Sequence, residues 1–257
     1  MSKYFLKLNP LKSQIIVFCS ESLKHQFHIN VFFLDNSCIR FCHAVKNLGC
    51  ILDTHLTLEH QVNNCVSSIF SSIKNIARIK FFLTKKELTI LVSSFIVSKL
   101  DYCNSLYYGI NNCLMKKLQY AQNCAARLIY NKRKYDHVTK LMIELHWLPV
   151  KFRIWYKICL LIFKCINHAS YAHPEELQSL LTINHSTRFV QLKMQRNNLK
   201  ISDRAFSVCA PKLWNQLPTN LKNEKSFTSF KCDLKTYLFR CAYINQWCEA
   251  ILRMKWT

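Results

Sequence analysis

The chain has 257 residues, of which 50% are hydrophobic and 13% aromatic, so it can bury a core and is not intrinsically disordered. Only two residues are glycine, which excludes the glycine-rich loops of dinucleotide and nucleoside-triphosphate sites. The net charge is +22, and 30 of the 36 Lys and Arg residues lie after residue 60, which predicts a polyanionic partner, most simply nucleic acid.

Three further sequence features indicate the cellular compartment in which we expect the protein. The longest apolar stretch without charge, residues 88–98, is about half of the roughly 20 residues that span a bilayer, so we expect a buried helix face and no membrane partner. The fourteen cysteines are scattered, as expected of reduced core residues. The first residues contain no apolar segment typical of a secretion signal. We therefore expect an intracellular protein, cytoplasmic or nuclear and not secreted.

The N-terminal part of the chain has the pattern of short strands. Four runs rich in β-branched and aromatic residues, separated by polar breaks, predict a small antiparallel sheet up to about residue 56: QIIVFCS, NVFFLD, SCIRFCHA and NLGCILD. Gly49, in the last of these runs, is expected at a turn that needs a positive φ or a close backbone approach.

The apolar spacing then changes to three and four residues, which predicts amphipathic helices. The first starts near Leu58 with Thr57 as N-cap, and the second starts at Thr84, which has the spacing of a capping box with Glu87. A third is expected over residues 112–130. The sequence thus predicts an α+β protein that is mostly α-helical.

The C-terminal half continues this pattern. A strongly apolar helix is expected from Pro149 through residue 167, heavily buried by its neighbours. Residues 182–200 are polar and are expected to form a loop or an extended excursion. Two last helices are predicted to start at Ser202 and Ser226, each acting as N-cap.

Six basic residues concentrate on the third helix and just after it, interleaved with Tyr120, Tyr130 and Tyr135. The six are Lys116, Lys117, Arg127, Lys132, Arg133 and Lys134. Such a face would contact the phosphates of RNA, DNA or an RNA/DNA hybrid in a salt-sensitive way that is independent of sequence. The alternative is an ordinary solvated helix face.

Catalytic and metal signals are weak. The fourteen acidic residues are dispersed, and the only adjacent pair, Glu175 and Glu176, is expected at a helix N-terminus, where the helix dipole favours acids. We predict no metal site, no cofactor and no small-molecule substrate. A zinc module stays open as a minor alternative, although it has no CxxC motif. Its ligands would come from His25, His28, Cys38, Cys42 and His43.

Seven segments resemble the C-terminal part of the reverse transcriptases of non-LTR (LINE-type, jockey-like) retrotransposons and occur in the order found in that family. They are FLKLNPLKSQIIVF, VKNLGCILD, SKLDYCNSLYYG, LQYAQNCAARLIY, LHWLPVKFRIWYKI, DRAFSVCAPKLWNQLP and SFKCDLKTYLF. No single segment is diagnostic, but together they cover nearly the whole chain.

The resemblance implies a palm remnant over residues 1–56, a helical thumb over 57–135 and a C-terminal helical region over 136–257. Lys12 matches the lysine of motif D, which assists proton transfer to the leaving group in that family. Leu48 and Gly49 match the primer-grip hairpin of motif E.

The family's catalytic aspartates include an Asp-Asp turn, and this chain contains no Asp-Asp pair. We therefore expect no polymerase activity from the chain alone, and Mg²⁺ only in the full-length parent enzyme. The residual role would be non-specific nucleic-acid binding. The alternative is a helical protein-interaction scaffold whose basic surface meets an acidic partner.

Overall fold

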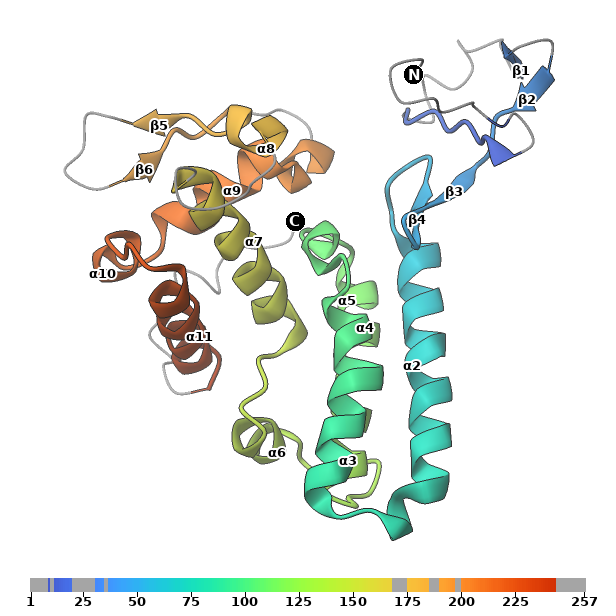
Figure 1. Cartoon of the computed structure of the whole chain (residues 1–257), viewed down its shortest axis with the longest axis vertical. Coiled ribbons are helices and arrows are strands. Elements are labelled where there is room, and N and C mark those ends of the chain that lie inside the picture. The colour runs from blue at the N-terminus through green and yellow to red at the C-terminus, as the bar shows by residue number, and fades with distance from the viewer. Residues whose placement is uncertain are drawn as a thin grey trace. The chain divides into compact units, whose positions relative to one another are not determined.

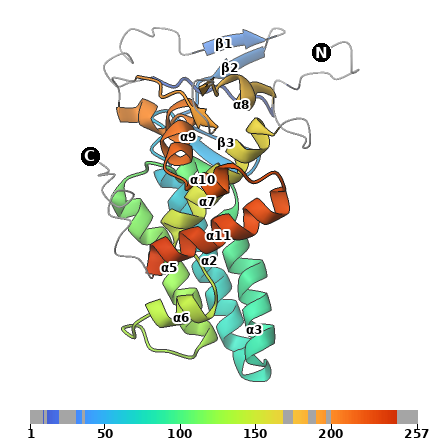
Figure 2. The same ribbon diagram turned by 90° about the vertical axis from the view of Figure 1, so that its left-hand side faces the viewer.

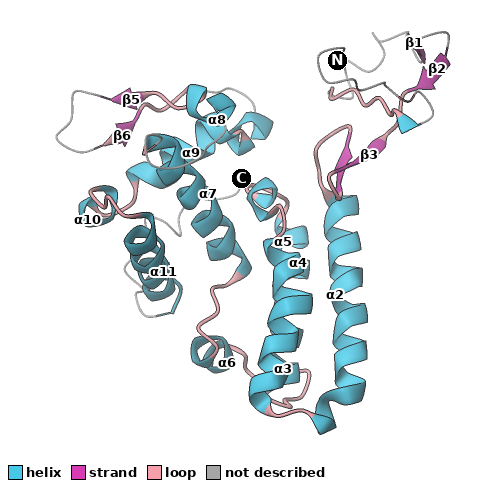
Figure 3. Cartoon of the chain, viewed as in Figure 1, coloured by secondary structure: helices cyan, strands magenta, loops and turns pink. Residues whose placement is uncertain are grey.

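The computed structural model describes residues 9, 12–19, 31–34, 37–167, 175–184, 190–196 and 200–243. The chain divides into two compact units, Met1–Cys65 and Val66–Thr257, which are described separately below. Helices dominate the described residues, and the strands form small antiparallel pairs (Figure 3). The predicted class, mostly α-helical with a small β element, is confirmed at this level.

The first unit contains two separate β-hairpins. Strand β1 (Val31–Leu34) pairs with β2 (Ser37–Arg40), and β3 (Ala44–Asn47) pairs with β4 (Cys50–Asp53). Within the described residues these hairpins do not join, so the expected single sheet is wrong. Among its described residues, the run QIIVFCS contributes an isolated parallel bridge between Ile15 and Phe41.

The β3–β4 hairpin turns through Leu48 and Gly49, whose φ angles are 46° and 85°. Positive φ at both residues of a two-residue loop is typical of a type I′ turn, whose twist matches that of the flanking strands. Gly49 adopts this conformation without the steric cost that a Cβ would bring. The turn expected at Gly49 is therefore confirmed.

Asp53 fixes the entry into the first long helix, α2 (Glu59–Ile79). Its carboxylate accepts hydrogen bonds from the backbone N–H groups of His55, Thr57 and Leu58, at 3.2, 2.8 and 2.7 Å. Thr57 accepts from Glu59 N at 3.3 Å, but α2 starts two residues after Thr57. The expected N-cap was thus misplaced, because Asp53 organises the turn.

Several helices of the second unit follow from local signals. The capping box of Thr84 and Glu87 opens α3 (Lys85–Val92), as expected. One π-helical turn, η4 (Ser93–Val97), joins α3 to α4 (Ser98–Asp101), and the 3₁₀ turn η5 (Asn104–Tyr107) follows. Helix α5 (Asn112–Ile129) matches its predicted range.

The core of this unit is built around α7 (Val150–Ile166), which starts directly after Pro149. It contacts α5 and α11 (Phe227–Tyr243); Figure 1 shows it between them, and in Figure 2 α11 crosses in front of it. The rings of Phe163 and Phe230 stack with centroids 4.2 Å apart. The heavy burial predicted for this helix is confirmed.

The remaining elements complete the C-terminal half. They are α6 (Thr139–Glu144), α8 (Glu175–Ser179), β5 (Ile183–Asn184), β6 (Gln191–Leu192), η7 (Lys200–Arg204), α9 (Phe206–Asn215) and α10 (Thr219–Lys222). Helix α8 starts at Glu175, as expected for the acidic pair. Ser202 lies inside η7, and the N-cap of α9 is Ala205, so the predicted cap at Ser202 is wrong.

Candidate nucleic-acid interface

Two segments far apart in the sequence form a basic surface at one end of the second unit. Residues 78–87 join α2 to α3 through the 3₁₀ turn η3 (Lys80–Phe82), and residues 130–136 follow α5. We call this surface the cationic tip. Its seven cations are Arg78, Lys80, Lys85, Lys86, Lys132, Arg133 and Lys134, against two carboxylates.

Direct contacts hold the two segments of the cationic tip together. The Lys80 ammonium donates to Asn131 Oδ1 at 2.7 Å, across 51 positions of sequence. The Lys85 ammonium lies 3.8 Å from the ring centroid of Tyr130, within the range of a cation–π contact. Burial, reinforced by a hydrogen bond and repulsion from Glu144, raises the pKa of Tyr130 to about 12.

Both carboxylates of the cationic tip accept hydrogen bonds from local backbone groups. Glu87 accepts from Thr84 N and from the Thr84 hydroxyl, both at 2.8 Å, and these bonds lower its pKa. Asp136 accepts from Arg133 N at 2.8 Å. The two acids thus help to shape the turns, and the surface keeps an excess of positive charge.

The six predicted cations fall into three groups. Lys132, Arg133 and Lys134 are exposed in the cationic tip. Lys116 and Lys117 are exposed near the start of α5, about 20 Å away along a helix that rises ~1.5 Å per residue. These two groups of cations therefore lie near opposite ends of α5. Arg127 has a third, different environment.

Arg127 is half-buried and holds the turn after α5. Its Nε and Nη2 donate to the backbone oxygen of Asp136 at 3.1 and 2.9 Å. Its Nη1 is buried without a hydrogen-bond partner among the described residues. With two donors committed to the backbone, Arg127 is a positioning residue for the turn that carries Lys132 and Lys134.

The structure adds two exposed aromatic residues that the sequence reasoning missed, Phe81 and Phe82, to Tyr135, which it had included. Phe81 and Phe82 are 81% and 88% exposed on η3, and Tyr135 is 87% exposed. The Lys80 ammonium lies 5.1 Å from the ring centroid of Phe81. The signal was present in the sequence as KFF followed by TKK, but the capping box in the same stretch explained it only as a helix start.

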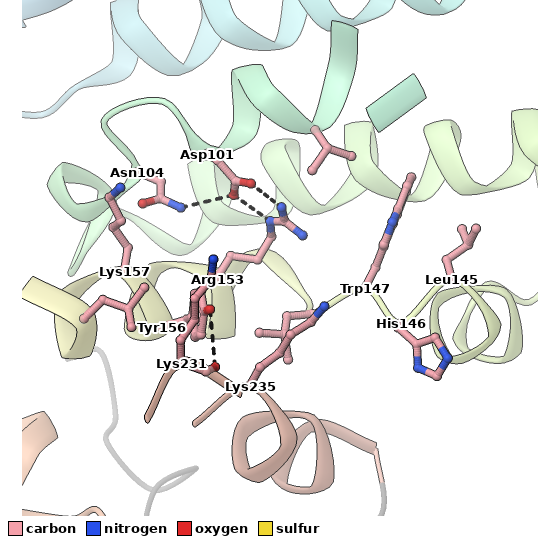
Figure 4. Close-up of a pocket in the computed structure, with 13 residues that line it drawn as sticks. Asp101, Asn104, Leu145, His146, Trp147, Arg153, Tyr156, Lys157, Lys231 and Lys235 are labelled. Carbon is pink, nitrogen blue, oxygen red and sulfur yellow. Dashed lines mark hydrogen bonds and ion pairs between the residues drawn. The ribbon is translucent and has the colours of Figure 1, made fainter. Parts of the chain in front are cut away.

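A pocket of about 460 Å³ forms a second basic surface on this unit (Figure 4). Inside it, Arg153 forms an ion pair with Asp101, and its Nε lies 2.8 Å from Asp101 Oδ1. Asn104 also donates to Asp101 Oδ1, at 3.4 Å. The acid is thus neutralised internally, which leaves a positive rim formed by Lys157, Lys231 and Lys235.

The residues assigned by resemblance to the palm lie in the first unit. Lys12 is exposed, and its backbone N–H donates to Asn9 O at 3.1 Å. Leu48, at the tip of the β3–β4 hairpin, is 85% exposed. The hairpin is thus present, while its predicted role as a primer grip stays a prediction.

No group of three or more His, Cys, Asp or Glu side chains suited to a metal occurs among the described residues. His25 and His28 of the zinc alternative lie outside them. Of the helices that are described, none combines the length and apolar character needed to cross a bilayer.

Comparisons of this chain with protein-family models, curated proteins and solved structures found no match.

Proposed function

We propose that the second unit binds nucleic acid without sequence specificity, through the phosphate backbone, at the cationic tip. The observation that carries this proposal is the joining of residues 78–87 and 130–136 into one surface with seven cations and two carboxylates. Lysine and arginine side chains that neutralise phosphates release counterions, which gives affinity to any nucleic acid.

The motif order described above supports the further proposal that the chain is a C-terminal part of a non-LTR retrotransposon reverse transcriptase. The type I′ hairpin at Gly49 suits the motif E assignment, and the helices that follow suit a thumb. We assign no polymerase step to this chain, because it has no Asp-Asp pair. Its own cations would bind and orient a polyanion.

The test is a salt titration of binding to a fluorescent RNA/DNA hybrid, followed by anisotropy. If four phosphates are contacted, affinity should fall on the order of a hundredfold between 50 and 200 mM salt. The variant Lys132→Glu/Lys134→Glu should bind more weakly and reduce the log–log salt slope by about 2.

A matched variant controls for net charge. Lys193→Glu/Lys225→Glu makes the same change at two exposed lysines outside the cationic tip and should leave the salt slope within about 0.5 of the wild type. Equal losses in both variants would assign binding to overall charge and refute a local site. Salt-sensitive binding of poly-glutamate, together with no binding of the RNA/DNA hybrid, would favour the protein-interaction scaffold.

A further inference from the structure

The strongest unexplained feature of the cationic tip is its pair of exposed phenylalanines. Phe81 and Phe82 are adjacent, and Ile79 beside them is 47% exposed. Burying such side chains is favourable, so contiguous exposed aromatic surface marks a contact site. The rings are therefore candidates for direct contact with a ligand.

The backbone that carries these rings is fixed on both sides. Helix α2 leads directly into η3, and Thr84, two residues after Phe82, is the N-cap of the next helix and forms its capping box. The bond from Lys80 to Asn131 ties the same turn to the segment after α5. The phenylalanines thus stand on a short, braced turn.

The positive charges near the two rings indicate which kind of ligand would bind them. Lys86 lies beyond the rings in the sequence, and Lys132 and Lys134 stand on the segment bonded to η3, all three exposed. A ligand that offers flat aromatic faces and regularly spaced negative charges matches this arrangement. Unpaired nucleotides have both features, whereas the base faces inside a duplex are covered by neighbouring pairs.

We propose that the cationic tip preferentially binds single-stranded nucleic acid, with unpaired bases stacked on Phe81 and Phe82 and the adjoining phosphates held by the surrounding lysines. This inference rests on the proposed function and names its preferred substrate. An anionic membrane surface would also attract cations beside aromatic rings, but such contacts are typically made by a longer amphipathic helix. Here the two exposed rings occupy one 3₁₀ turn of three residues.

The experiment compares a 12-nucleotide oligo-dT strand with a 12-base-pair duplex by anisotropy at fixed salt. The wild type should bind the single strand at least tenfold more tightly. Stacking contributes about 1–3 kcal/mol per base, so Phe81→Ala/Phe82→Ala should weaken single-strand binding by at least tenfold and duplex binding by less than threefold.

Substitutions of graded chemistry separate stacking from simple apolar contact. Phe81→Leu/Phe82→Leu keeps apolar surface and should still lose single-strand affinity, while Phe82→Trp should retain it. Phe33→Ala, at a 72% exposed position on β1, is the matched control and should bind like the wild type.

Each alternative gives a distinct result. Equal binding of single strand and duplex, unchanged in Phe81→Ala/Phe82→Ala, would refute the stacking inference and leave the proposed function standing. Failure to bind either ligand would overturn both. Binding to vesicles rich in phosphatidylserine that survives in the leucine variant, without single-strand preference, would replace the inference with a membrane contact.

Discussion

Asp53 should control the junction between the β3–β4 hairpin and α2, and replacing it with asparagine tests this. Asp53 is 7% exposed, and its carboxylate accepts three backbone N–H bonds. Hydrogen bonds to a charged acceptor contribute about 1.5–3 kcal/mol each. Because asparagine retains one carbonyl acceptor, Asp53→Asn should lose roughly 3 kcal/mol locally, or on the order of a hundredfold in the opening equilibrium.

Hydrogen exchange read by mass spectrometry measures this opening. Peptides covering residues 57–62 should exchange on the order of a hundredfold faster in Asp53→Asn. Asp136→Asn removes a charge from the other unit and should not change exchange in these peptides. Acceleration below about fivefold in Asp53→Asn would refute the argument that its carboxylate organises the turn.

The pH dependence gives a second test of the same residue. Burial acts to raise the pKa of Asp53, but the N–H groups of Thr57 and Leu58, the Thr57 hydroxyl and His55 N outweigh it, so the pKa lies below its ordinary value of 3.8. A carboxyl group with a lowered folded-state pKa stabilises the fold fully above its unfolded pKa. Protection of residues 57–62 should therefore decline as pH falls below about 4, and Asp53→Asn should lack that decline.

Three more changes have defined outcomes. Thr84→Ala should lower the free energy of unfolding by about 1 kcal/mol in urea denaturation, because it removes the capping box. Gly49→Ala should cost about 1–2 kcal/mol in the same assay, since alanine must adopt φ 85°. Burial, with a smaller contribution from Cys209, raises the pKa of Cys159 to about 12, so iodoacetamide at pH 8 should modify the exposed Cys113 and spare Cys159 in the native protein.

The elements that could be predicted are those specified by nearby residues. Thr84 and Glu87 are three positions apart, so their spacing was sufficient to predict the capping box of α3. The β3–β4 turn likewise needs only Gly49 and its neighbours. The start of α2 was misplaced because Asp53 lies five residues before Leu58, outside the spacing of a standard cap. Leu58 itself has a φ of 60°, which helix propensity does not anticipate.

The cationic tip could be predicted only in part, because its second half comes from a distant segment. The run from Lys132 to Lys134 is visible in the sequence, but nothing there reveals that Asn131 accepts a hydrogen bond from Lys80. The run KFF beside TKK is visible in the sequence, but the exposure of Phe81 is not, since phenylalanine is more often buried. Both facts depend on tertiary structure.

Arg127 shows why charge alone does not identify a nucleic-acid contact. It belongs to the same predicted group of six cations as Lys132, yet its guanidinium is half-buried against the Asp136 carbonyl, while Lys132 is exposed. Replacing Arg127 would release the turn and displace the lysines that it positions, so any loss of binding would combine folding with contact. Lys132 and Lys134 are exposed and do not hold the turn, so their replacement reports on the interface while the turn that presents them stays in place.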